Sequence, residues 1–397
     1  MIAPSTVSVR HRFGRTALRA TLALASLAAP VRILPAQANL SGQGLGYPTG
    51  QLSARAAGTG GAIGEIDPLS QLNPAALGFA GTTTLFFQIE PEFRRVNAGS
   101  LSDKTTTARY PLFAAAIPLG SSWAVGISSA TLLDRTWTTS TRTTVVAGSD
   151  TVASTFIYGS DGSINDLRLA AQWMPATWAR LGLGGHLISG SDRVFIGRTF
   201  ENSAFGSFAD TSILSFDGGA VSAGVQIIAP KVAILSAAYR KGGQLNARRS
   251  DTALGSARVP DRLGFSVAYI GIAGTQIAAR TSYDKWAALN GLRRGAAEAV
   301  NAWDTSLGAD ISGPHFGAAA PLMLRVGGRW RTLPYEAAGK PVRERSVSAG
   351  LGALFAGGRV LTDLTLIRAA RDADITSGGS AINERAWTLS IGLGVRP

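Results

Sequence analysis

The chain contains no cysteine and only three histidines, His11, His186 and His315. Without thiols it can form neither a disulfide nor a thiolate metal site, and cysteine nucleophiles are excluded. No two histidines stand at zinc-site spacing, and no Gly-x-Ser-x-Gly elbow frames a reactive serine. We therefore predict no catalytic residues, no metal and no cofactor, so the protein is not expected to be an enzyme. A lipase that uses His186 as its base is the alternative.

Long apolar runs are also missing. After residue 38 no stretch approaches the about 18 uncharged apolar residues that indicate a membrane-spanning helix. The net charge is +13, with 38 Lys and Arg against 25 Asp and Glu. The arginines are scattered and form no basic block, so nucleic acid is not an expected partner. Attraction to an anionic lipid or polysaccharide surface stays open.

Residues 1–38 have the features of an export signal. They carry five arginines and no acid, and an apolar run from Ala20 to Val31 follows most of these arginines. Ala36-Gln37-Ala38 fits a small-x-small cleavage site. The apolar run is shorter than the about 20 residues that a spanning helix needs. We predict that this segment is a signal peptide and not an anchor.

The rest of the chain is rich in alternating polarity. In 386–396, Trp387, Leu389 and Ile391 share one face while Thr388 and Ser390 share the other. Because side chains alternate across a strand, each such run has one apolar and one polar face. Similar runs lie at 166–174, 322–331 and 360–367. Short strands of this kind are typical of a transmembrane barrel, in which closure satisfies every backbone group.

The joints between these runs alternate between short and long. Short turns are expected at 118–122, 175–177, 229–231, 272–274 and 356–358. Longer polar stretches are expected at 190–210, 240–258, 287–302, 334–344 and 371–383. Short turns on one rim and long connections on the other are the outer-membrane pattern. The sequence predicts an all-β, antiparallel barrel of about 14 strands, although 139–163 and 300–320 can be divided in more than one way.

Charged residues within the predicted strands should point into the barrel. A charged arginine that faces lipid costs about 2–4 kcal/mol at the bilayer midplane. Two roles are open for these side chains: ion pairs that stiffen the wall, or attraction of a carboxylate head group. The candidates for the lumen are Arg168, Arg180, Arg280, Arg325, Arg329 and Asp363.

A small-residue segment precedes the first strand and carries a recognisable pattern. It reads Ala54-Arg55-Ala56, Gly58-x-Gly60-Gly61-Ala62, Asp67, and Asn73-Pro74-Ala75. This pattern resembles the N-terminal signature of the FadL-like long-chain fatty-acid transporters, which the related PorV-like proteins share. Weaker similarity continues at 259–265, 324–335 and 347–355. One departure is that the family often has two adjacent acids before the Asn-Pro-Ala turn, whereas here Pro68 follows Asp67.

The resemblance implies an N-terminal hatch, or plug, over residues 39–80 and a barrel over 81–397. It implies passive movement of hydrophobic, fatty-acid-like molecules across the bacterial outer membrane, past the hatch. Adjacent glycines permit positive φ and close backbone approach, and Asn before Pro favours a fixed turn. The matching hatch positions are Gly60, Gly61, Ala62, Asp67, Asn73, Pro74 and Ala75.

Three alternatives remain beside this interpretation. A PorV-like scaffold would bind secreted proteins and transport no small molecule. A general diffusion porin would have a wide polar lumen and no hatch, and a soluble β-protein would not need membrane lipid. The expected partners are outer-membrane lipid and hydrophobic small molecules, with secreted proteins as partners only in the scaffold case.

Overall fold

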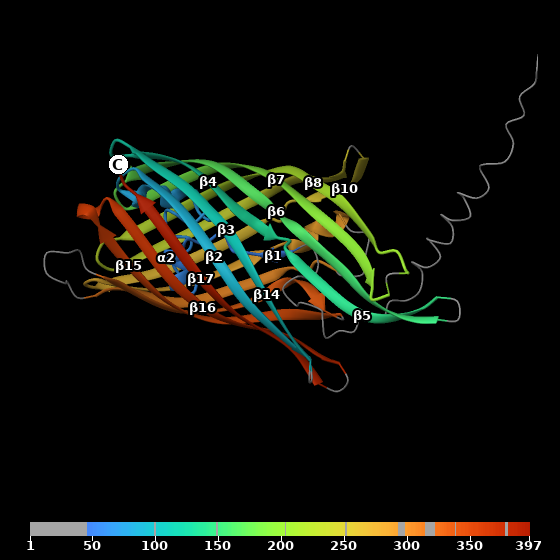
Figure 1. Ribbon diagram of the computed structural model, residues 1–397. Helices are drawn as coiled ribbons and strands as arrows, with labels where there is room; N and C mark the ends of the chain where they lie inside the picture. The colour runs from blue at the N-terminus through green and yellow to red at the C-terminus, as the bar shows by residue number, and fades with distance from the viewer. Residues whose placement is uncertain are drawn as a thin grey trace, which may run out of the picture. The chain divides into compact units, whose positions relative to one another are not determined.

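The structure, a computed structural model, describes residues 46–397 except 99–100, 148–149, 203, 251, 293–297, 314–321, 338 and 378–379. The predicted signal peptide and the first residues of the predicted hatch lie outside the described residues. The described chain forms one seventeen-stranded antiparallel sheet in which fourteen strands make a closed barrel (Figure 1). The predicted fold class is confirmed.

The barrel strands run in chain order around the wall, each paired with the next. Their bounds are β2 Thr84–Ala98, β3 Leu101–Leu119, β4 Trp123–Asp134, β6 Asp150–Ala176, β7 Ala179–Phe200, β8 Phe208–Ala229, β9 Ala233–Arg249, β11 Arg262–Ile272, β12 Thr275–Asp284, β13 Ala302–Ser312, β14 Met323–Ala337, β15 Lys340–Phe355, β16 Val360–Ser377 and β17 Ser380–Val395. β17 pairs with β2 from Ile382↔Ala98 to Val395↔Leu85, and this seam closes the barrel.

Three further strands extend the sheet. β1, Tyr47–Pro48, pairs with the end of β4, while β5, Trp137–Ala147, pairs with β6 and β10, Thr252–Arg258, pairs with β9. The helical segments are α2 Ala54–Gly58, η3 Pro74–Ala80, η4 Trp286–Leu292 and η5 Ala356–Gly358. Among the described residues, no helix is long and apolar enough to cross a membrane.

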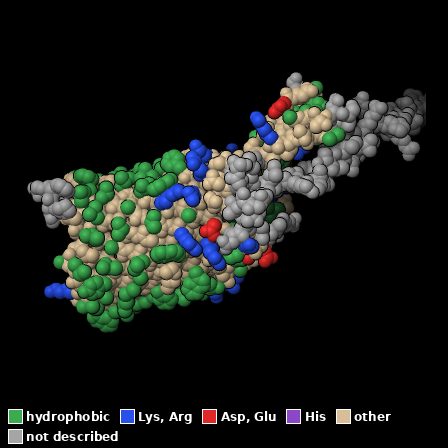
Figure 2. Space-filling view, turned by 90° about the horizontal axis from the view of Figure 1, so that it is seen from below, with side chains coloured by type: hydrophobic (Ala, Val, Ile, Leu, Met, Phe, Trp, Pro, Cys, Tyr) green, Lys and Arg blue, Asp and Glu red, His purple; other side chains and the backbone are tan. Residues whose placement is uncertain are grey.

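The two faces of the wall differ in polarity, as the alternation predicts. Leu183, Leu187 and Val221 point outward with more than half of their surface exposed, whereas Arg325 and Asp363 are buried on the inner face. Figure 2 shows the resulting apolar surface on the outside of the barrel. The wall thus carries its charges mainly inside and its large apolar side chains outside.

The expected short turns are present, but most of the expected long connections are not loops. β7 continues to Phe200, β9 to Arg249 and β16 to Ser377, so polar stretches taken as connections are extended hairpins. Of the five polar stretches, 287–302 lacks a long strand and contains part of η4. The polarity pattern does not distinguish a loop from an extended hairpin, because both faces of a hairpin that extends beyond an apolar belt can be polar.

Residues 47–80, hereafter the inner segment, lie inside the barrel. Ala54, Ala56 and Ala62 are fully buried, and α2 packs against β14, β15, β16 and β17. η3 packs against the inner face of the opposite part of the barrel, formed by β3, β4, β6, β7 and β8. The inner segment therefore spans the interior and contacts most of the barrel strands.

Candidate functional site

The inner segment is held in shape by its own polar side chains. Ser53 caps α2 and its hydroxyl accepts a hydrogen bond from Ala56 N at 3.1 Å. One carboxylate oxygen of Asp67 accepts hydrogen bonds from Ser53 Oγ at 2.6 Å and from Ser70 N at 2.9 Å. Gly60 has φ of +68°, a conformation that disfavours any side chain. Asp67 thus ties the first half of the segment together from within.

Asn73 joins the inner segment to the wall. Its Oδ1 accepts from Ala75 N at 2.9 Å, which caps η3, and Pro74 occupies the first position of that helix. Its Nδ2 donates to Ser236 Oγ of β9 at 2.7 Å and to the Glu65 carbonyl oxygen at 3.0 Å. The Asn-Pro-Ala turn is therefore an attachment point as well as a turn.

Glycines in the wall make room for this segment. A Cβ on Gly327 of β14 would overlap the backbone of Thr59, and one on Gly182 of β7 would overlap Pro74 and Ala75. Gly60 is equally close to the wall, since its Cβ would lie 2.7 Å from the Gly328 carbonyl oxygen. Strand glycines commonly mark close approach of another backbone. Here that other backbone belongs to the inner segment.

A buried ion pair fixes the middle of the inner segment. Glu65 is fully buried and accepts hydrogen bonds from Arg262 of β11 and, at 3.4 Å, from Arg280 Nε of β12. Burial alone would raise the pKa of the Glu65 carboxyl, but the two guanidinium groups hold it below its ordinary value. The same Arg280 also donates to Asp304 of β13 at 3.1 Å.

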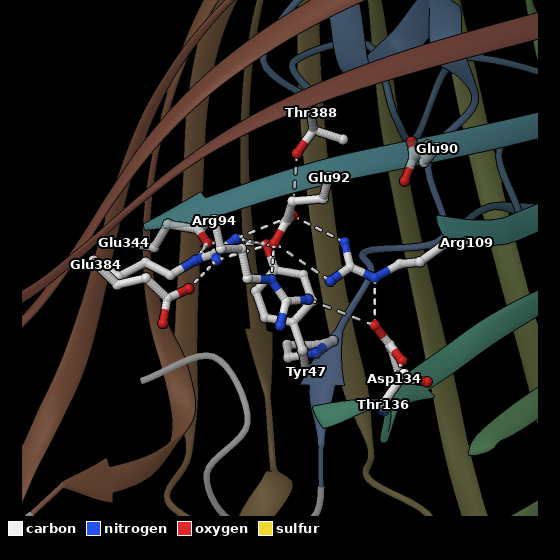
Figure 3. A network of polar contacts seen from close by, with 12 residues as sticks. Tyr47, Glu90, Glu92, Arg94, Arg109, Asp134, Thr136, Glu344, Glu384 and Thr388 are labelled. Carbon is white, nitrogen blue, oxygen red and sulfur yellow. Dashed lines mark hydrogen bonds and ion pairs between the residues drawn. The ribbon is translucent and has the colours of Figure 1, made fainter. Parts of the chain in front are cut away.

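A second polar cluster surrounds the Tyr47 ring (Figure 3). The guanidinium carbons of Arg109, Arg331 and Arg371 lie 4.6–4.9 Å from its centroid, within cation–π range. Its hydroxyl donates to Glu344 Oε2 at 2.9 Å and accepts from Arg371 and Arg331. The further acids that bind these arginines are Glu92, Asp134 and Glu384. We call this set the Tyr47 cluster.

The Tyr47 cluster lies beside an interruption in the wall. β3 pairs with β4 only from Leu112↔Ala130 to Leu119↔Trp123, although β3 itself begins at residue 101. Beyond that point β4 pairs instead with β1, through Tyr47↔Asp134 and Pro48↔Leu133. The ion pair of Arg109 with Asp134 links β3 to β4 where backbone hydrogen bonds between them are missing. At this end of β4, β1 of the inner segment therefore takes the pairing position that β3 leaves empty.

A large apolar cluster lies on the inner face toward the rim with the long hairpins. It combines inward side chains of β4, β6, β7, β8 and β9 with Trp286 and Leu289 of η4. Trp286 is 5% exposed, so η4 covers the cluster from inside the rim. The large side chains that the strands contribute include Leu133, Ile164, Ile188, Phe216 and Leu245.

Two small cavities separate the inner segment from the wall. One, of about 40 Å³, lies between the apolar cluster and a group of arginines that includes Arg240, Arg262 and Arg280. The other, of about 50 Å³, lies beside Tyr47 and Glu92. Both are far smaller than the roughly 300–1,000 Å³ of ordinary ligand pockets. In this conformation neither cavity has room for a hydrophobic compound of drug or fatty-acid size.

The six lumen candidates lie in different places and do not form one site. Arg325 binds Asp363 at 2.5 Å, and Arg329 and Arg280 share Asp304. Arg180 stacks over the Phe79 ring at 3.8 Å, outside any ion pair between described residues. Arg168 is 2% exposed, and its Nε and Nη1 bind no described group.

His186 belongs to a hydrogen-bonded row on the inner wall. Its Nδ1 lies 2.8 Å from Asp166 Oδ1, and its Nε2 lies 2.9 Å from Ser222 Oγ. The residue types are those of a serine hydrolase. However, Ser222 is only 7% exposed, and Asp166 also accepts a hydrogen bond from Gln51 of the inner segment at 3.0 Å. The row accordingly acts here as a link between β6, β7, β8 and the inner segment.

Sequence reasoning missed Glu65, Tyr47 and Glu92. Glu65 is an acid in a stretch of glycines and apolar residues, a signal that predicts burial with a cation. Glu92 follows Gln88 and precedes Arg94 at even spacing, which indicates an inner face of β2, but Pro91 obscured the strand. Tyr47 carries no local signal, because its partners are as far as 324 residues away along the chain.

Comparison with known proteins finds the fold and not a close relative. No family model and no curated protein matches the chain. A FadL homologue of Pseudomonas aeruginosa matches with a TM-score of 0.57 at 12% identity, over 88% of this chain and 99% of the other.

Two channels for aromatic compounds match similarly. The toluene transporter TodX of Pseudomonas putida has a TM-score of 0.54 at 12% identity, over 88% of this chain and 99% of its own. The monoaromatic hydrocarbon channel CymD has 0.52 at 12%, over 87% and 97%. These neighbours are named as transport proteins and not as enzymes. The resemblance to the FadL-like transporters is thereby confirmed in the fold, which this chain shares over nearly its whole described length.

Proposed function

We propose that the protein is a bacterial outer-membrane channel through which hydrophobic small molecules diffuse passively, without catalysis or cofactor. The observation that carries this proposal is the interruption between β3 and β4, filled by β1 of the inner segment. A closed wall would offer only an axial, polar route. An interrupted wall offers an apolar molecule a sideways exit into lipid.

The distribution of polarity supports a membrane location. Outward-facing Leu169, Leu187 and Val347 are each about 60% exposed, which is unfavourable in water and favourable in a bilayer. Inward arginines such as Arg262 and Arg325 are paired with buried acids. A soluble β-protein would expose the charges and bury these aliphatic side chains.

Residues 39–80 would then act as the hatch. The cavities of about 40 and 50 Å³ are too small for a fatty acid or an aromatic hydrocarbon, so passage requires the inner segment to shift. Asn73, Glu65 and Tyr47 are its attachment points to the wall. In this proposal Gly60, Gly61 and the Asn-Pro-Ala turn permit close packing of the closed state.

A fatty-acid-like substrate is the class that suits the interior best. The cavity of about 40 Å³ places Leu132 and Trp286 next to Arg240, Arg262 and Arg280. An apolar surface beside an excess of positive charge fits a molecule with an apolar body and a carboxylate head. A neutral hydrocarbon would use the apolar part alone.

Uptake by cells that lack their own transporter tests the proposal. Cells with this protein in the outer membrane should take up labelled long-chain fatty acid faster than cells without it. A variant with Asn73→Ala and Pro74→Ala should change the rate, because the link to Ser236 is lost. Asn383→Ala, which removes only a contact with Asn97 at 3.3 Å, is the matched control. Equal uptake with and without a correctly assembled barrel, for both fatty acid and toluene, would refute the channel.

A PorV-like scaffold for secreted proteins is the second candidate. The observation that favours it is the packed interior, where the Tyr47 cluster joins β2, β3, β4, β14, β15, β16 and β17. Such an interior suits a rigid wall that transports nothing. Crosslinking from the β5 hairpin in intact cells would capture a secreted protein if this function is correct, in the absence of any uptake.

A further inference from the structure

A row of cations crosses three adjacent strands on the outer surface of the barrel. Lys104 of β3 lies directly opposite Arg95 of β2, and Arg95 lies directly opposite Arg385 of β17. All three side chains are exposed. Residues directly opposite in antiparallel strands have Cβ atoms about 5 Å apart, and like charges at that distance repel. The directly opposed Arg95 and Arg385 therefore repel each other, and a bound anion would relieve this repulsion.

The protein does not supply that anion to the two arginines. Among the described residues, no acid forms an ion pair with Arg95 or Arg385. The nearest outward acid in the register is Asp372, which faces Arg343 in the next row and not this one. Beyond Arg385, the row continues with Ala370 of β16, which lies opposite Arg385. Arg345 of β15, a further exposed cation, lies opposite Ala370.

The cations border a hollow that also has an aromatic wall. A surface pocket of about 450 Å³ lies over β2, β3, β16 and β17, lined by Arg95, Lys104, Arg368, Arg385, Phe93 and Trp387. Phe93 and Trp387 are directly opposite each other and about half exposed. Arg368 stacks over the Trp387 ring at 5.0 Å. The pocket thus has a charged side and an apolar side.

The pocket lies at the border of the apolar surface. Moving along β17 from the cations, Arg385 is followed on the same face by Trp387 and then by Leu389, Ile391 and Leu393. Figure 2 shows Lys and Arg side chains gathered along a border of the apolar surface of the barrel. Aromatic residues at such a border lie at head-group level in a membrane.

We propose that this pocket binds the phosphorylated head group of an anionic membrane lipid, with the acyl chains of that lipid on the apolar surface below. Arginine binds phosphate oxygens in a bidentate manner, and a second arginine opposite the first permits two such contacts. The ligand is a lipid and not a soluble anion because the cations stand directly above aromatic and aliphatic side chains. This inference rests on the proposed membrane location but not on transport.

Binding of a defined lipid to the full-length protein in detergent tests the proposal. The probe is a fluorescent glucosamine glycolipid that carries two phosphates, compared with zwitterionic phosphatidylcholine. The variant with Arg95→Gln and Arg385→Gln should bind the phosphorylated lipid at least about tenfold more weakly than the native protein. High salt should weaken native binding, since exposed charges are screened.

Two further variants make the result specific. Lys231→Gln with Arg359→Gln removes the same charge from exposed positions at the opposite rim and should leave affinity unchanged. Arg95→Lys with Arg385→Lys keeps the charge but loses bidentate contact, and should give an intermediate affinity. Faster migration of the unboiled protein in detergent gels checks that each variant is folded.

Three outcomes would overturn the proposal. The first is equal affinity of the native protein and the Arg95→Gln, Arg385→Gln variant for the phosphorylated lipid. The second is equally tight binding of phosphatidylcholine by the native protein. The third is displacement of the lipid by millimolar inorganic phosphate, which would assign the pocket to a soluble anion. Uptake is not part of this test, so failure of the transport proposal would leave its result intact.

Discussion

Glu65 attaches the middle of the inner segment to two arginines of the wall. Its replacement by Gln would remove the acid that Arg262 and Arg280 share, and would leave Arg280 with Asp304 and, among the described acids, Arg262 only with Asp284 at 3.9 Å. Breaking a buried pair by removing one partner costs about 3–5 kcal/mol. We expect Glu65→Gln to lower the free energy of unfolding by about that amount, measured by urea unfolding in lipid vesicles. Glu201→Gln, at an exposed position, should leave stability unchanged.

The same pair gives a dependence on pH. Because the folded-state pKa of Glu65 is lowered, its contribution is complete above the ordinary glutamate value of about 4.3 and is lost as pH falls through the lower folded value. The stability difference between native protein and Glu65→Gln should be constant from pH 7 down to about 5 and shrink below about 4. A difference that grows on acidification would contradict this assignment.

Gly327 tests whether the wall must lack side chains where the inner segment touches it. A methyl group there would meet the backbone of Thr59, and overpacking costs about 1–3 kcal/mol. We expect Gly327→Ala to expose the inner segment, so that trypsin cuts after Arg55 sooner than in the native protein. Gly185→Ala, whose methyl group would meet nothing within 4 Å, is the control.

Among the elements, β1 is the shortest and the most consequential. Pro48 and Leu133 are antiparallel partners, and such partners lie about 4.5–5.5 Å apart between Cα atoms, within disulfide range. The chain has no other cysteine. If substrates leave between β3 and β4, the Pro48→Cys, Leu133→Cys variant should transport at least about fivefold more slowly when oxidised, with recovery on reduction. Equal rates in both states would exclude movement of β1 from the pathway.

The elements also mark how far the sequence can predict this fold. The alternation over 386–396 predicts a strand, and the short turns predict one rim of the barrel. Both can be predicted because they depend only on residues close together in the chain. The place of β1 could not be predicted, since two residues carry no periodicity and their partners lie in β4. The family pattern located Asn73 and Gly60, but the wall contacts of Glu65 and Tyr47 depend on strands about 200 to 320 residues away.

At the scale of the whole molecule, the outer apolar surface should define the membrane belt. Leu183 of β7 is 68% exposed within this surface, and Val146 of β5 is 73% exposed on a hairpin that extends the sheet. An arginine near the bilayer midplane costs about 2–4 kcal/mol, and one beyond the interface about 0–1. Leu183→Arg should therefore destabilise the protein in lipid vesicles far more than Val146→Arg. Equal effects would argue against a belt at β7.

The seam between β17 and β2 has a consequence for biogenesis. The inner segment precedes β2, yet Tyr47 is bound by Arg371 of β16, and Glu384 of β17 completes that arginine's shell of acids. The other partners of the Tyr47 hydroxyl, Arg331 and Glu344, lie in β14 and β15, so the N-terminal tyrosine cannot complete its contacts until the last four strands are synthesised. If the seam closed first, the segment would have to thread into a sealed cylinder. We expect the barrel to be inserted as an open sheet that closes around the inner segment. Pairing of the interior arginines with Tyr47 and the acids would then favour closure of the seam.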